Sequence, residues 1–230
     1  MQIKKLNFNN HNWQLNIEDE ADESVVAEIF KWREYKIAEE VILKSQDLIV
    51  DVGAHRGFFT IYCRSFNSQV PIIAVEPEIQ NIKALKKHLL INNITDVEII
   101  EAGLAATSDE RWLKRSSDSH NHVLALPEEE LKSIENVMVK TLTLESASKD
   151  YSEISLLKMD IEGGEYEIFE TMSDKMYNKI DYVIMEYHNI GHLNYKIIET
   201  LLREHGFGVQ IFPSHFDKTM GFLWAKNKRK

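Results

Sequence analysis

The sequence is short of several features that mark particular classes of protein. It has a single cysteine, Cys63, so no disulfide can form within the chain, which fits a reducing compartment. No stretch approaches about 18 consecutive apolar residues, the length that a membrane-spanning helix needs, and the first residues lack the apolar core of a signal peptide. We therefore expect a cytoplasmic protein with no membrane span, in which Cys63 is a buried and unreactive thiol.

Positive charge is also scarce. The chain has 27 Lys and Arg residues against 37 Asp and Glu residues, which gives a formal net charge of -10 at pH 7. A protein with this balance is a poor binder of nucleic acid through bulk electrostatics. A local basic patch stays open as an alternative, because Lys and Arg gather in the segments 83–87, 114–115 and 226–230.

What the chain does have is material for a core. Hydrophobic residues make up 43% and aromatic residues 10% of its 230 residues, enough for one sizeable α/β domain rather than two. It contains no internal repeat and no low-complexity linker. We expect a single domain over residues 1–230, with an N-terminal extension at 1–46 and a core at 47–230 that carries an insert at about 107–153.

The chain is organised around residues 47–60, DLIVDVGAHRGFFT. An apolar run ends at Asp51, a turn with Gly53 and Gly57 follows, and a helix-compatible segment begins at Phe58. Strand, glycine turn and helix form the unit by which an α/β sheet presents a ligand to a helix N-terminus. We expect Gly53 to let the backbone turn sharply and approach the ligand, and Gly57 to let the helix pack tightly against the strand.

The spacing in this turn favours one ligand. A nicotinamide fingerprint reads G-x-G-x-x-G, with its first glycine where Asp51 stands, whereas this chain reads D-x-G-x-x-x-G. A carboxylate at the strand end repels a pyrophosphate and suits a cationic amino group. This points to S-adenosylmethionine, which carries an amino group and a sulfonium but no phosphate. An ordinary turn without a ligand is the alternative.

Apolar periodicity predicts alternating helices and strands along the chain. The helices are expected at 24–43 with Ser24 as its cap, at 79–89, from Glu165 onward and at 193–205; the strands are expected at 11–17, 48–50, 70–75, 97–100, 137–144, 154–159, 182–185, 209–212 and 222–225. The βαβαβ order after residue 47 implies a parallel sheet with right-handed crossovers. In the first helix, Trp32 and Tyr35 are expected to pack in the core, with a lid over the site as the alternative.

The insert breaks this rhythm. We expect a hairpin or β-ribbon there, with an acidic turn or helix at 127–135, and we expect it to shape the substrate pocket because insertions at the ligand edge of such sheets often do. Its His120 and His122 form an H-x-H pair. Without a further Cys or His group nearby, no zinc site is expected.

Carboxylates follow several strands at the edge where ligands of open α/β sheets bind. Glu76, followed by Pro77, ends the second strand and could accept both ribose hydroxyls, although a carboxylate that only favours the next helix start is the alternative. Glu101 and Ala102 end the third strand and would lie near the adenine.

The densest group of acids is LLKMDIEGGEYEIFE, with Asp160, Glu162, Glu165 and Glu167 within eight residues. So many carboxylates at one strand end are unfavourable unless cations offset them. A sulfonium and an ammonium group would do so, as would a divalent metal or N–H groups of a substrate. A solvated helix start is the alternative.

The stretches DVGAHRGFFT, AVEPE, LLKMDIEGGEYEIFE and VIMEYH together resemble the FkbM family of S-adenosylmethionine-dependent methyltransferases, over residues 24–188. The L-K-x-D-x-E-G-x-E block is the specific part of the resemblance. It implies a class I methyltransferase fold, a Rossmann-like three-layer sandwich whose mostly parallel seven-stranded sheet has an antiparallel last strand pair. It also implies methyl transfer to a hydroxyl of a sugar, polyketide or other small molecule. Two positions depart from the family pattern: His55 stands where Asn is common, and Glu145 where Asp is usual.

Methyl transfer to a hydroxyl requires alignment of donor and acceptor and removal of a proton. Our candidate catalytic residues are Asp160, Glu162, Glu165 and His188, with Glu186 as a further candidate base; no metal site is assigned. The residues expected to bind the cofactor are Asp51, Gly53, Ala54, Gly57, Glu76, Pro77, Glu101, Ala102 and Asp160. A tRNA or other RNA methyltransferase and a non-catalytic S-adenosylmethionine-binding protein are the alternatives to an enzyme with a small-molecule or glycan acceptor.

Overall fold

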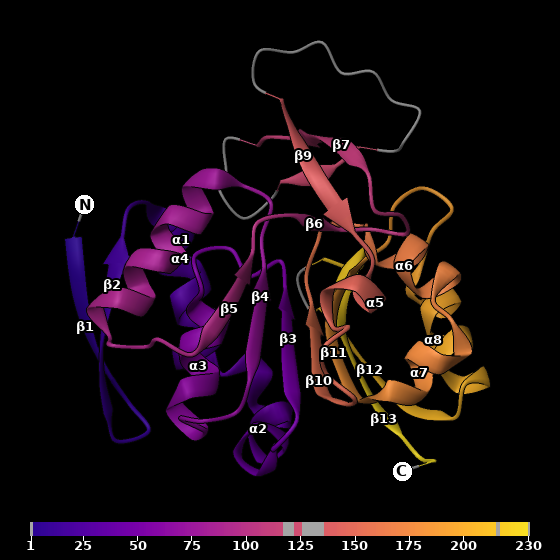
Figure 1. Cartoon of the computed structure of the whole chain (residues 1–230), viewed down its shortest axis with the longest axis horizontal. Coiled ribbons are helices and arrows are strands. Elements are labelled where there is room, and N and C mark those ends of the chain that lie inside the picture. The colour runs from indigo at the N-terminus through magenta and orange to yellow at the C-terminus, as the bar shows by residue number, and fades with distance from the viewer. Residues whose placement is uncertain (1, 117–121, 126–135, 215–216, 230) are drawn as a thin grey trace.

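A computed structural model describes residues 2–116, 122–125, 136–214 and 217–229. Its centre is a seven-stranded sheet with the strand order β12-β13-β11-β10-β3-β4-β5 (Figure 1). The strands are β3 (Leu48–Val52), β4 (Ile72–Val75), β5 (Val97–Ile100), β10 (Ile154–Met159), β11 (Ile180–His188), β12 (Phe207–Pro213) and β13 (Met220–Asn227). β13 alone runs in the direction opposite to the other six strands, so its pairings with β11 and β12 are antiparallel. The mostly parallel seven-stranded sheet with an antiparallel pair at its end is confirmed.

Helices cover both faces of this sheet because its central strands are apolar on both sides, as parallel strands usually are. Alternate residues divide between two cores: Leu48 and Val50 face one, and Ile49 faces the other. The first core is closed by α6 (Glu165–Thr171), α7 (Asp174–Lys179) and α8 (Tyr195–Glu204); the second is closed by the N-terminal segments and α3 (Phe58–Phe66). Helix α4 (Ile79–Ile91) packs beside α3, and α5 (Leu144–Ala147) follows the insert.

The N-terminal extension begins with a hairpin of β1 (Gln2–Phe8) and β2 (His11–Ile17), and β2 confirms the strand expected at 11–17. The single helix expected at 24–43 is wrong. The chain instead forms α1 (Glu20–Val26), a π-helix η1 (Ala27–Trp32), a 3₁₀-helix η2 (Glu34–Ala38) and α2 (Glu39–Lys44). The break falls at Arg33, which has φ 57°.

A local cap explains where the helix starts, and burial of Tyr35 accompanies its break. Asp19 caps α1 because its side chain accepts from the Asp22 N–H, whereas the Ser24 hydroxyl donates to Glu28 within the helix. After the break Tyr35 is buried, while Trp32 is 60% exposed and does not pack in the core. Burial of Tyr35 therefore outweighs continuation of the helix.

The glycine turn and the N-terminal extension are joined by a buried arginine. Arg56 lies in the turn and is 6% exposed. Its guanidinium forms ion pairs with the fully buried Asp22 and with Asp19. The start of α1 is thereby fixed against the turn.

The insert is a β structure, as expected. Strands β6 (Gly103–Leu104), β7 (Glu110–Lys114), β8 (Val123–Leu124) and β9 (Val137–Leu142) form a sheet in the order β6-β9-β7-β8. It stands above the carboxyl edge of the central sheet (Figure 1). The acidic turn or helix expected at 127–135 lies outside the described residues. None of the helices that the structure describes has the length and hydropathy to cross a membrane.

Candidate active site

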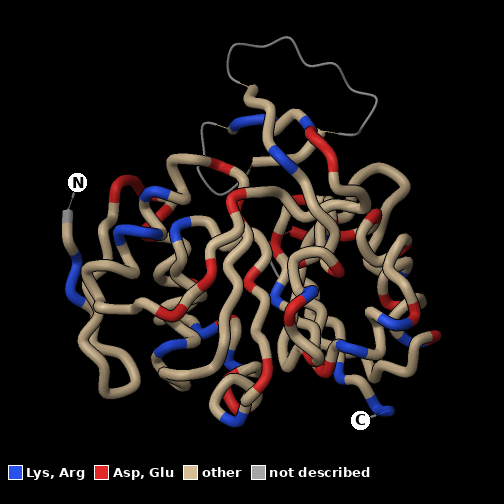
Figure 2. The backbone as a smooth tube through the Cα atoms, in the orientation of Figure 1, with Lys and Arg blue, Asp and Glu red and all other residues tan. Residues whose placement is uncertain are grey.

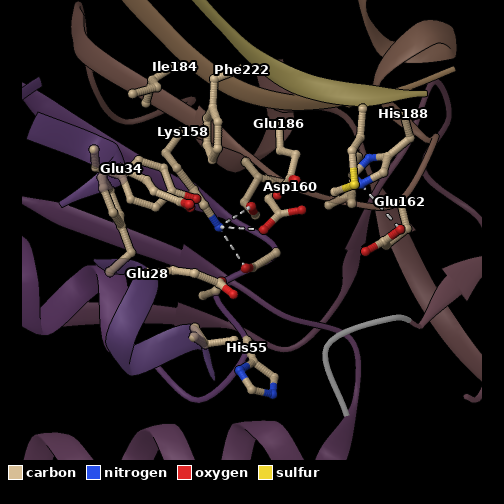
Figure 3. A pocket seen from close by; sticks show the side chains of 18 of the residues that line it. Glu28, Glu34, His55, Lys158, Asp160, Glu162, Ile184, Glu186, His188 and Phe222 are labelled. Carbon is tan, nitrogen blue, oxygen red and sulfur yellow. Dashed lines mark hydrogen bonds and ion pairs between the residues drawn. The ribbon is translucent and has the colours of Figure 1, made fainter. Parts of the chain in front are cut away.

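A cavity of about 820 Å³ opens at the carboxyl edge of the central sheet. One end is walled by the glycine turn, the end of β4 and the insert. The other end is walled by the ends of β10 and β11, by η1 and η2, and by the β12–β13 hairpin. Figure 3 shows Lys158, Asp160 and Glu186 pointing toward one another, with Glu28 and Glu34 approaching from the N-terminal segment. We refer to the end of the cavity at the glycine turn as the turn end, and to the end at β10 and β11 as the acid end.

The glycine turn is shaped by backbone contacts. Gly53 has φ 69°, and a Cβ there would lie 1.8 Å from the carbonyl oxygen of Asp160. Only glycine lets the turn pass so close to the end of β10. Gly57 has φ 83°, and a Cβ there would lie 3.1 Å from Leu85 of α4. The close neighbour of Gly57 is thus a helix and not the strand that we expected.

Asp51 does not face the cavity. It is fully buried, accepts a hydrogen bond of 2.8 Å from Thr60, and lies 3.3 Å from the ammonium of Lys158 on the adjacent strand. Lys158 also donates to the Gly53 carbonyl at 2.9 Å. Burial alone would lower the pKa of Lys158, but Asp51 and Asp160 hold it above its usual value.

Lys158 is a site residue that the sequence reasoning missed. It lines the cavity, and its Nζ lies 4.0 Å from the Asp160 carboxylate. A signal was present: a lysine inside an apolar buried strand requires an anionic partner. Parallel pairing of β3 and β10 places Asp51 opposite Lys158 and supplies that partner.

Glu76 and Pro77 line the turn end of the cavity, together with Ala54. Glu76 is 5% exposed, and its carboxylate accepts from the backbone N–H groups of His55 at 2.8 Å and Glu78 at 2.9 Å. Burial raises the pKa of Glu76 to about 7. The Asn81 side-chain amide also donates to Oε1 of Glu76, at 3.4 Å, so Oε2 is the oxygen that keeps a lone pair for a ligand.

Glu101 and Ala102 are not brought to the cavity. Glu101 is exposed and forms an ion pair with Lys86 of α4, whereas Ala102 is buried. The next two residues, Gly103 and Leu104, line the cavity instead. The chain therefore reaches the ligand edge slightly later than the sequence pattern indicates.

The acid end unites Asp160, which directly follows β10, with Glu186 and His188 of the adjacent strand β11. Oxygens of Asp160 and Glu186 and a ring nitrogen of His188 lie within 4.8 Å of one another, a spacing that a divalent cation could also bridge. Glu186 and His188 lie inside β11 rather than beyond it, because β13 extends the pairing to them. Burial, and then the charge of Asp160, raise the pKa of Glu186 to about 9.

His188 is held by two further carboxylates. Its Nε2 lies 3.4 Å from Glu162, and its Nδ1 lies 3.7 Å from Glu165. Burial would lower the pKa of His188, but Glu165 and Glu162 raise it to about 9. Glu165 is fully buried, accepts from the Ile161 N–H at 3.2 Å and does not line the cavity. Glu165 therefore contacts His188 but has no side-chain surface in the cavity.

The N-terminal extension completes the acid end. Tyr35 is 5% exposed and packs between Phe59 and Phe222, with ring centroids 4.7 and 5.6 Å away. Its hydroxyl makes no hydrogen bond with any residue that the structure describes. Burial, and then the charges of Asp160 and Glu186, raise the pKa of Tyr35. The same causes, burial and neighbouring acids, raise the pKa of Glu34 to about 7.

These residues could not be found from motifs. Glu28, Glu34 and Tyr35 line the cavity from η1 and η2, where the sequence indicated only a core helix or a lid. In the insert, His122 lines the cavity and His120 lies outside the described residues.

Comparison with known proteins agrees with this arrangement. Residues 51–209 match the family described as "Methyltransferase FkbM domain". "Methyltransferase 1" of Beauveria bassiana is 22% identical over 208 residues, which cover 82% of each chain. "Methyltransferase sdnD" of Sordaria araneosa is 25% identical over 215 residues, which cover 80% of this chain and 82% of that protein.

A solved structure shares the fold. SMU.1697c of Streptococcus mutans, described in complex with SAH, has a TM-score of 0.52 at 10% identity, over 84% of this chain and 97% of that chain. At this identity the likeness concerns the fold, a class I methyltransferase fold. The family match covers more than half of the chain, including the glycine turn, Glu76, Asp160, Glu186 and His188. The chain belongs to the FkbM family of methyltransferases.

Proposed function

We propose that this enzyme transfers a methyl group from S-adenosylmethionine to a hydroxyl oxygen of a sugar, polyketide or other small molecule. One observation carries the proposal. A single cavity contains a backbone-lined turn with Glu76 at one end and a group of acids with a paired histidine at the other. The first suits a nucleoside, and the second suits a sulfonium and a hydroxyl that loses its proton.

The donor is assigned to the turn end with its methyl group toward the acid end. Glu76 accepts from a ribose hydroxyl, while Gly53, Ala54 and Pro77 form the adjoining wall. The acids at the other end attract the sulfonium and the amino group of the donor. The complex of the Streptococcus mutans protein with SAH supports this choice of ligand.

The transfer itself is an in-line displacement. A lone pair of the acceptor oxygen forms the new C–O bond, the C–S bond breaks, and its electron pair stays on sulfur as a thioether. The acceptor hydroxyl loses its proton to Asp160, which we assign as the general base. Lys158, at 4.0 Å from Asp160, holds this carboxylate in place.

The protonation of His188 and Glu186 depends on whether the donor is bound. With pKa values of about 9, His188 is protonated and Glu186 is neutral at pH 7. His188 is therefore not a base in this state, and it instead pairs with Glu162 and Glu165. A bound sulfonium lowers both pKa values, since it favours the anion and disfavours the cation. Donor binding would thus shift Glu186 toward its ionised form.

The acceptor is assigned to the space between Tyr35, Glu34 and Glu186. Neither carboxyl group has a hydrogen-bond or ion-pair partner among the described residues, and the Tyr35 hydroxyl is likewise unpaired there. Such groups suit an acceptor with several hydroxyls. The aromatic rings of Tyr35 and Phe222 supply apolar contact beside them.

Surface charge gives less support to an RNA acceptor. Figure 2 shows Lys and Arg interspersed with Asp and Glu along the described chain. Two of the cations that could form a basic patch are engaged by acids: Lys86 by Glu101 and Arg115 by Glu78. Paired cations of this kind have little charge left for phosphate.

Radiolabelled methyl transfer tests the proposal. The protein is incubated with methyl-labelled S-adenosylmethionine and an extract of its source cells, which is then separated into RNA, glycan and small-molecule fractions. We expect label in the glycan or small-molecule fraction, with loss of that label in Asp160→Asn. Label in RNA would replace the acceptor class, and label in no fraction would contradict the proposal.

A further inference from the structure

We expected the insert to shape the substrate pocket, and in the structure it lines the turn end of the cavity. Leu113 of β7 and Leu124 of β8 face each other in register and both line the cavity. A Cβ on Gly103 would lie 2.7 Å from Leu124, so β8 packs directly on β6. These contacts lie at the turn end. Arg111 of β7 also joins the insert to α6, through an ion pair of 2.6 Å with Glu167.

The place where the insert meets the cavity adjoins Glu76. The Glu76 N–H donates to the carbonyl of Ile100 at 3.1 Å, and Gly103 follows three residues later. Leu104 and Leu113 are each 1% exposed, so the wall beyond Glu76 is largely aliphatic, with His122 as a polar member. If Glu76 accepts from a ribose, the group attached to that ribose lies against this wall.

One ion pair ties the insert to the Glu76 loop. Arg115, just after β7, donates to the carboxylate of Glu78 at 2.8 Å. Glu78 is 1% exposed, accepts from the Asn81 N–H at 3.0 Å and donates its own N–H to Glu76. The position of the insert and the position of Glu76 are therefore coupled through Glu78.

We infer that the insert is the cover of the purine base of the donor, with Leu113 and Leu124 against the face of the base. Arg115 is a positioning residue that sets this cover relative to Glu76. The inference rests on the donor proposed above. Its physical basis is that a purine has apolar faces, which gain from burial against aliphatic side chains, beside a ribose that needs a polar partner.

Calorimetric titration with two probes, S-adenosylhomocysteine and adenosine, tests the inference without an acceptor. We expect Leu124→Ala to weaken both probes by the same factor, about tenfold, because adenosine carries the whole group that the insert contacts. Lys140→Ala is the matched control, since this exposed residue lies on β9 of the same insert. It should bind both probes as the unaltered protein does.

Two substitutions of Arg115 test the inference independently of Leu124. We expect Arg115→Ala to weaken both probes by about threefold, and Arg115→Lys to restore most of the loss, because the ion pair is partly exposed. This arm decides the matter if Leu124→Ala does not fold, as judged by its thermal unfolding.

Unchanged affinity of both probes in Leu124→Ala and Arg115→Ala would overturn the inference. An equal loss in Lys140→Ala would also overturn it, since the insert would then act through general stability. If the unaltered protein binds no S-adenosylhomocysteine, the donor assignment falls and the inference with it. The two failures are thereby told apart.

Discussion

The two ends of the cavity satisfy their polar groups in different ways. At the turn end, the Glu76 carboxylate accepts two backbone N–H groups, and Gly53 packs on the end of β10. At the acid end, Glu34, Glu186 and Tyr35 have no hydrogen-bond partner among the described residues. The turn end is thus organised before a ligand arrives, whereas the acid end has polar groups that a ligand would complete.

We expect the largest effect, complete loss of donor binding, from a substitution at the turn end. In Gly53→Ala, the new Cβ would collide with the Asp160 carbonyl at 1.8 Å in a backbone conformation that alanine rarely adopts. We expect calorimetry to detect no S-adenosylhomocysteine binding. Gly191→Ala is the control, because Gly191 also has a positive φ, +59°, but nothing within 4 Å. Equal binding in the two variants would contradict a preformed turn end.

A substitution at the acid end should lower the rate of methyl transfer while donor binding persists. We expect Asp160→Asn to lower kcat by about 10²- to 10⁴-fold, the usual contribution of a general base, with S-adenosylhomocysteine affinity changed only a few-fold. Glu170→Gln, an exposed acid on α6, should change neither quantity. A kcat that survives in Asp160→Asn would remove Asp160 as the base.

The pH dependence of donor affinity should report Glu76. Its pKa is raised to about 7, and the ionised form accepts more strongly from a ribose hydroxyl. Affinity for S-adenosylhomocysteine should therefore rise with pH, by about tenfold between pH 6 and pH 8. In Glu76→Gln the affinity should be low and this rise should disappear. A rise that persists in the variant belongs to another group.

Tyr35→Phe should separate the two ends with a smaller effect. The variant keeps the packing against Phe59 and Phe222 but loses one unpaired hydroxyl. We expect KM for the acceptor to rise about threefold to tenfold, the worth of a typical hydrogen bond, while donor affinity stays constant. A lower affinity for the donor with an unchanged KM for the acceptor would place Tyr35 beside the donor.

Chelation should have the smallest effect. If carboxylates alone remove the proton, dialysis against EDTA leaves the rate of methyl transfer unchanged. Loss of activity that Mg²⁺ or Mn²⁺ restores would give the group of Asp160, Glu186 and His188 a metal-binding role, which its spacing permits.

The same contrast separates what the sequence could predict from what it could not. The strands, the turn at Gly53 and the helix start at Phe58 follow from local patterns and are confirmed. The Asp51–Lys158 pair arises from strand register, and Tyr35 reaches the cavity only because the chain breaks at Arg33. Both depend on contacts between distant segments, which neither spacing nor periodicity reports.

The insert teaches a related lesson. Its β character was evident from the alternation in VMVKTLTL, and β9 confirms it. Which end of the cavity it lines depends on how β9 pairs with β6 and how Arg115 meets Glu78. Local sequence identifies such an element, but only tertiary contacts assign it to a substrate.

The ion pairs of Arg56 limit how far the N-terminus of this enzyme can be truncated. The family match begins at residue 51, yet the carboxylates that neutralise Arg56 belong to Glu18, Asp19 and Asp22. A recombinant fragment that starts at residue 51 would leave the Arg56 guanidinium without these ion-pair partners, in the loop next to Glu76. The smallest working enzyme therefore has to include α1, although no recognisable motif lies there.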